Sequence, residues 1–66
     1  MHEEIKEKLL NHFGKKTEIA RFLGTNRQTI NHWFNGSGKP DVRSAMKLAK
    51  ALDIDWLDIR HDLRDV

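Results

Sequence analysis

The chain has 66 residues, a formal net charge of +2 and no cysteine, so we expect one domain held together without disulfides or thiolate metal sites. No apolar run approaches the about 20 residues of a membrane span, and residues 1–5 lack the basic and then apolar order of a signal peptide. These features predict a soluble, intracellular protein whose core comes from packed helices.

A first helix is predicted over residues 1–13. Ile5, Leu9 and Phe13 recur every four residues and form one apolar face, and Gly14 follows as a stop signal. Here and in the rest of the chain, apolar and polar residues do not alternate as they would in a half-buried strand. The sequence therefore predicts helices only.

Two short helices joined by a tight turn are predicted over residues 16–23 and 27–35. Ala20 and Ile30 are ten residues apart, and Gly24 follows Ala20 by four. In a helix-turn-helix unit, a small alanine lets the helices cross closely, a glycine turns the chain, and an apolar side chain fills the angle between the helices. The spacing of these three residues favours that unit.

A loop over residues 36–40 contains two glycines and a proline, and it separates this unit from two further predicted helices. Asp41 is expected to cap the fourth helix, and Asp55 with Asp58 to begin a fifth. The expected fold is an all-α, compact five-helix bundle in a single domain over residues 1–66. The inner face predicted for the fourth helix consists of Val42, Ala45, Met46, Ala49 and Leu52, and that for the fifth of Trp56, Ile59, Leu63 and Val66.

Polar side chains cover the outer face predicted for the helix over 27–35. At about 100° per residue, Ile30 and Trp33 point inward, whereas the outward side chains all form hydrogen bonds and none is acidic. In the major groove of DNA, arginine matches guanine, and glutamine or asparagine matches adenine. The residues predicted to contact DNA bases are Arg27, Gln28, Asn31 and His32, together with Asn26, the expected N-cap of this helix.

Basic residues flank this helix. Between Lys15 and Lys50, eight basic residues oppose two acidic ones for a net charge of +6, whereas residues 53–66 carry five aspartates and two arginines for a net charge of −3. A helix start that combines positive charge with free backbone N–H groups suits a phosphate. The residues predicted to contact the DNA backbone are Lys15, Lys16 and Thr17 on one side, and Asn35, Lys39 and Arg43 on the other.

The stretch over residues 15–36, KKTEIARFLGTNRQTINHWFNG, resembles the helix-turn-helix of the Cro and lambda-type phage repressors and their bacterial relatives. The proline of the following loop and the Lys-Leu-Ala-Lys-Ala-Leu of residues 47–52 extend the resemblance, and Phe13 with Gly14 resembles the small all-helical Cro proteins. The resemblance implies a repressor that binds double-stranded operator DNA as a homodimer, in the cytoplasm of a bacterial or phage-infected cell.

By position, the resemblance implies base contacts for Arg27, Gln28 and His32, and backbone contacts for Lys16 and Asn35. It places Asn26 where family members contact either a base or a phosphate. Where Lys16 stands, the family commonly has a glutamine that binds phosphate and also supports the recognition helix. A lysine at this position can still bind phosphate, but it does not supply the glutamine that usually supports the recognition helix.

The sequence leaves two alternatives open. In the first, the protein is an antitoxin that uses the same fold to bind DNA and its acidic C-terminal helix to mask a toxin. In the second, the chain is the excised DNA-binding domain of a longer repressor. Phe34 is expected either to lie at the edge of the core or to contact the second subunit of a homodimer. Further candidate interface residues are Trp56, Leu57, Ile59 and Leu63.

Catalysis is not expected. The four histidines are scattered along the chain, and no pair lies at i, i+4 with a carboxylate, so we expect no metal site. No serine has a plausible base beside it by motif, and so small a bundle is not expected to hold a substrate pocket. The prediction is a binding protein that needs no cofactor and takes no small-molecule substrate.

Overall fold

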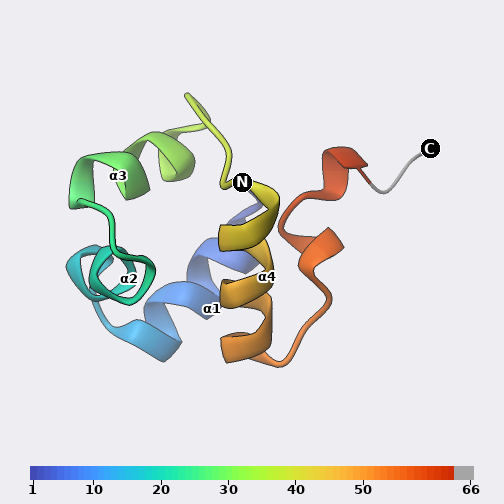
Figure 1. The fold of residues 1–66 in the computed structure, drawn as a ribbon, viewed down its shortest axis with the longest axis horizontal. Helices are drawn as coiled ribbons and strands as arrows, with labels where there is room; N and C mark the ends of the chain where they lie inside the picture. Colours follow the sequence, from blue (N-terminus) through green and yellow to red (C-terminus); the bar gives the residue numbers. More distant parts are fainter. Residues whose placement is uncertain (64–66) are drawn as a thin grey trace.

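Four α-helices precede two single 3₁₀ turns in this computed structural model, which describes residues 1–63 (Figure 1). The helices are α1 (Glu3–Phe13), α2 (Lys16–Leu23), α3 (Arg27–Asn35) and α4 (Val42–Leu52), and the turns are η1 (Trp56–Asp58) and η2 (His61–Leu63). In Figure 1, α4 lies between the α2–α3 pair and the two turns. The first four predicted helices are confirmed. No helix within residues 1–63 has the length and apolar character to cross a membrane.

The turn between α2 and α3 follows the predicted pattern. α2 ends at Leu23 and is capped by Gly24, whose φ of 71° lies in the left-handed region, where glycine has no Cβ to clash. The N–H of Thr25 then donates to the carbonyl of Ala20 at 2.9 Å, so the chain reverses within a few residues. Ala20 is buried, which allows α2 and α3 to pack closely.

Asn26 caps α3, as the sequence predicts. Its Oδ1 accepts hydrogen bonds from the N–H of Thr29 at 2.9 Å and from the Thr29 hydroxyl at 3.1 Å. Replacing Asn26 by alanine removes this acceptor, so we expect the free energy of unfolding to fall by about 1 kcal/mol. Urea denaturation measures the change. Asn26→Asp keeps an acceptor oxygen and should retain most of the stability, and an unchanged midpoint for Asn26→Ala would contradict the capping role.

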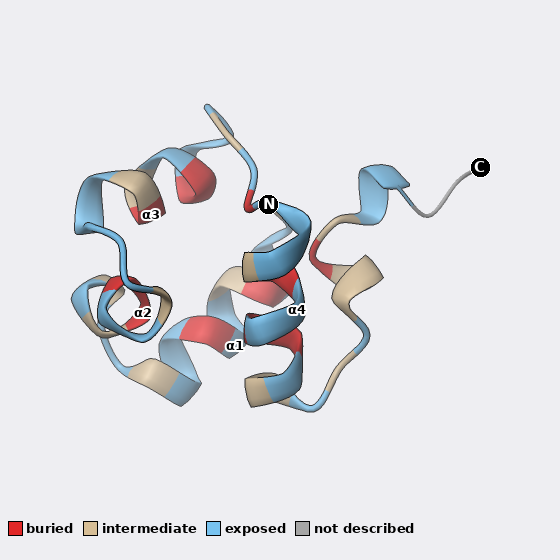
Figure 2. Cartoon of the chain, in the orientation of Figure 1, coloured by how far each residue is buried: buried red, intermediate tan, exposed pale blue. Residues whose placement is uncertain are grey.

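One core joins all four helices and residues 53–63, which we call the C-terminal segment (Figure 2). Leu9 of α1, Ile19 of α2, Ile30 of α3 and Leu48 of α4 are its largest fully buried side chains. The other buried apolar residues are Ile5, Ala20, Trp33, Phe34, Ala45, Ala49 and Ile59. α3 is thus fixed to the rest of the domain through its inner face.

The predicted inner face of α4 is partly wrong. Val42 and Met46 are 38% and 49% exposed, whereas Leu48, which the prediction omitted, is fully buried. Ala45 and Ala49 are buried as predicted. Both the predicted and the observed stripes repeat at helical spacing, and the packing of α4 against α1 and η1 selects the one that contains Leu48.

The predicted fifth α-helix is also wrong, because η1 and η2 take its place. Oδ1 of Asp55 accepts from the N–H of Leu57 at 3.1 Å, so Asp55 caps the start of η1. The N–H of Ile59 then donates to the carbonyl of Trp56 at 3.0 Å, a three-residue step typical of a 3₁₀ turn. Burial of Ile59 against the core holds the segment in this conformation.

The candidate interface residues are distributed between core and surface. Phe34 is only 8% exposed and belongs to the core of its own chain, so the subunit-contact alternative fails for this residue. Among the others, Trp56 and Leu57 are half-buried, Ile59 is buried and Leu63 is exposed. Val66 lies outside the described residues.

Candidate nucleic-acid interface

α3 presents the predicted polar strip at the surface. Ile30 and Trp33 are buried on the inner side of the helix. The strip consists of the exposed residues Arg27, Gln28, His32 and Asn35, with Asn31 half-buried beside them. Asn26 is exposed too, and because its cap uses only Oδ1, its amide NH₂ can still donate a hydrogen bond. The structure therefore brings the predicted base-contacting residues to one accessible helix face.

A shallow hollow lies where α2 and α3 begin. Its volume is about 390 Å³, and its lining residues are Lys15, Lys16, Thr17 and Arg27. The first N–H groups of α2 have no acceptor within the helix, and the helix dipole adds partial positive charge at this end. The nearby carboxylate of Glu18 pairs with Arg21 at 3.0 Å, which offsets its negative charge. An anion such as a DNA phosphate fits the chemistry of this hollow.

Lys16 connects α2 to the far end of α3. Its Nζ lies over the ring of Phe34, 5.1 Å from the ring centroid. A cation over an aromatic face is attracted by the negative charge of that face. Lys16 thereby links α2 to α3. It does so at the position where the family that this chain resembles commonly has a supporting glutamine. The sequence did not indicate this contact, because Phe34 is 18 residues away along the chain.

The predicted backbone contacts on the other side of α3 are less uniform. Asn35 and Arg43 are exposed, the first in the last turn of α3 and the second in the first turn of α4. Asp41 holds the N-cap position of α4 as predicted, although its side chain makes no cap hydrogen bond. The hydroxyl of nearby Ser44 lowers the pKa of the Asp41 carboxyl, so this carboxylate is charged beside Arg43 at neutral pH. Lys39, in contrast, is already engaged within the protein.

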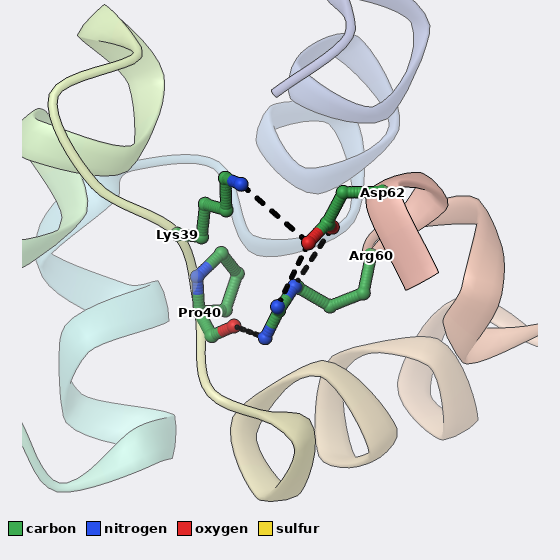
Figure 3. A network of polar contacts seen from close by, with 4 residues as sticks. All are labelled: Lys39, Pro40, Arg60 and Asp62. Atoms are coloured by element: carbon green, nitrogen blue, oxygen red, sulfur yellow. Dashed lines mark hydrogen bonds and ion pairs between the residues drawn. The ribbon is translucent and has the colours of Figure 1, made fainter. Parts of the chain in front are cut away.

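Lys39 belongs to a network of polar contacts that the sequence did not reveal (Figure 3). Asp62 of η2 lies 3.5 Å from the Nζ of Lys39 and accepts two hydrogen bonds from Arg60, at 3.0 and 2.9 Å. Arg60 also donates to the carbonyl of Pro40 at 2.9 Å. These partners are up to 23 residues apart, so no local pattern indicates them.

Electrostatics in this network favour the charged forms. The hydrogen bonds from Arg60 hold the pKa of the Asp62 carboxyl well below its usual range, and those same bonds raise the pKa of Arg60. Because the pKa of this carboxyl is lower in the folded state, its ionisation stabilises the folded protein at pH values above about 3.9, the pKa of an unfolded aspartate. This stabilisation is lost as the pH falls through the pKa of the folded state. At neutral pH the network is therefore fully charged.

The fold and this surface together define a helix-turn-helix DNA-binding domain: two helices joined by a tight turn, with an exposed polar strip on the second and a basic start on the first. The chain belongs to the helix-turn-helix family, whose model matches residues 5–59. The protein is thus a DNA-binding transcription regulator. Comparisons with curated proteins and with solved structures gave no match.

Proposed function

We propose that the protein is a Cro-type repressor that binds a pseudo-palindromic operator as a dimer. The observation that carries the proposal is the exposed strip of α3, which offers hydrogen-bonding side chains without an acid. α3 enters the major groove, where Arg27 and Gln28 at its start contact base edges, joined by Asn26, Asn31 and His32. The protein acts as a binding module, without catalysis, metal or cofactor.

Contacts with the DNA backbone orient α3 in this proposal. The hollow at the start of α2 receives one phosphate, with Lys15, Lys16 and Thr17 around it. On the other side of α3, the remaining backbone contacts come from Asn35, Lys39 and Arg43. A single short helix reads only a few base pairs, so two copies on a two-fold site supply the specificity that one lacks. The antitoxin alternative remains a prediction from the sequence.

Selection of bound duplexes from random DNA tests the proposal. We expect enrichment of a pseudo-palindrome whose half-sites are about 34 Å apart, one helical turn, with two chains bound per site. Affinity for the selected site should fall linearly on a log–log plot as salt increases, because bound phosphates release counterions. Enrichment of no sequence would contradict operator reading, and one chain on a single half-site would contradict the dimer.

A further inference from the structure

The loop after α3 is tied to the recognition helix. The N–H groups of Ser37 and Gly38 both donate to the carbonyl of His32, at 2.9 and 3.3 Å. Lys39 follows directly, so its position relative to α3 is fixed at the backbone. Its side chain is 64% exposed, which makes it accessible to a DNA backbone contacted by α3. Lys39 is therefore well placed for the phosphate contact assigned to it above.

A carboxylate of the same chain already faces this lysine. Asp62 lies 3.5 Å from the Nζ of Lys39, and two hydrogen bonds from Arg60 hold its carboxylate in one orientation (Figure 3). The guanidinium of Arg60 is in turn bonded to the carbonyl of Pro40, the residue after Lys39. A bidentate arginine–carboxylate pair is geometrically specific, so Asp62 is held against the loop.

We propose that Asp62 is an internal competitor of the DNA backbone: its carboxylate occupies Lys39 in the free protein, and binding of a duplex exchanges it for a phosphate oxygen. This inference rests on the proposed function and adds regulation to the same surface. The exchange proceeds without rupture of the Arg60 contacts, because Asp62 keeps its two hydrogen bonds from the guanidinium. The C-terminal segment thereby sets how strongly the loop after α3 attracts DNA.

The expected magnitude is that of an exposed ion pair. Pairs of this kind change an equilibrium by about twofold to fivefold, and salt screens them. The Asp62→Asn variant removes the competing charge while its amide oxygen can still accept from Arg60. We therefore expect Asp62→Asn to bind a random 20-base-pair duplex about twofold to fivefold more tightly at low salt, with a smaller difference at high salt.

Fluorescence anisotropy with this labelled duplex over a salt series measures the effect on the full chain. Asp53→Asn is the matched control, because it removes the same charge from an exposed residue at the end of α4. Asparagine tolerates the left-handed backbone of that position, where φ is 57°. The second arm repeats Asp62→Asn in a Lys39→Gln background. This background has no lysine for Asp62 to occupy, so the gain in affinity should disappear.

The outcomes separate the two proposals. A wild-type chain that binds no duplex would overturn the proposed function and the competition together. If the wild type binds, the competition alone is overturned by an unchanged or weaker Asp62→Asn, by an equal gain in Asp53→Asn, or by a gain that persists beside Lys39→Gln. A measurement on the wild type needs no variant to fold: the side-chain carboxyl ¹³C signal of Asp62 should shift when duplex is added, and a constant signal would also overturn the inference.

Discussion

Leu48→Ala is expected to destabilise the protein by about 2–5 kcal/mol, because it removes a fully buried side chain and leaves a cavity. A loss of this size is comparable with the whole net stability of a domain this small. Thermal denaturation followed by circular dichroism should show a lower Tm, by roughly 4–8 °C for each kcal/mol lost.

Met46→Ala is the matched control for this substitution. Met46 belongs to the same helix but is 49% exposed, so we expect its replacement to change the free energy of unfolding by no more than about 0.5 kcal/mol. The sequence alone predicts the opposite order, with Met46 inside and Leu48 omitted from the inner face. Equal losses for the two variants, or a larger loss for Met46→Ala, would refute the observed orientation of α4.

Arg27→Ala is expected to weaken binding to the selected operator by about 1–3 kcal/mol more than it weakens binding to random DNA. The reason is its proposed bidentate contact with a guanine, which only the correct base pair supplies. Anisotropy titrations with the operator, an operator altered at one base pair per half-site and a random duplex would measure this difference. The preference at that base pair should relax in the variant.

Arg43→Ala provides the contrast, because the same proposal assigns it to the DNA backbone. Removal of a phosphate contact should weaken binding to all sequences alike and reduce the salt slope by about 1. The two variants thus distinguish base reading from backbone attraction. Equal losses on operator and random DNA for Arg27→Ala would refute its base-reading role.

The sequence predicts the helix-turn-helix well because its determinants are local. Ala20, Gly24 and Ile30 lie within eleven residues, and each acts through backbone geometry or close packing with its neighbours. The exposed strip of α3 follows from the same periodicity, since a helix with Ile30 and Trp33 inside turns its opposite side, which carries Gln28, His32 and Asn35, outward. These features need no knowledge of the rest of the chain.

The parts that the sequence predicts poorly depend on distant partners. The side of α4 that is buried depends on where α1 and η1 lie, and two helical stripes compete for it. The C-terminal segment forms 3₁₀ turns while Arg60 bonds to Pro40, 20 residues earlier, a contact without local signal. For the same reason, the ion pair between Lys39 and Asp62 and the contact of Lys16 with Phe34 emerge only from the folded chain.

The contact of Lys16 with Phe34 has a consequence for the thermodynamics of association. A free lysine side chain loses up to about 2 kcal/mol of rotamer entropy when a ligand immobilises it. Over the ring of Phe34, the ammonium group of Lys16 is already restricted before any phosphate arrives. Its neighbour Lys15 is exposed and must be ordered during binding. If both cations contact phosphate as proposed, Lys16 does so at the smaller entropic cost.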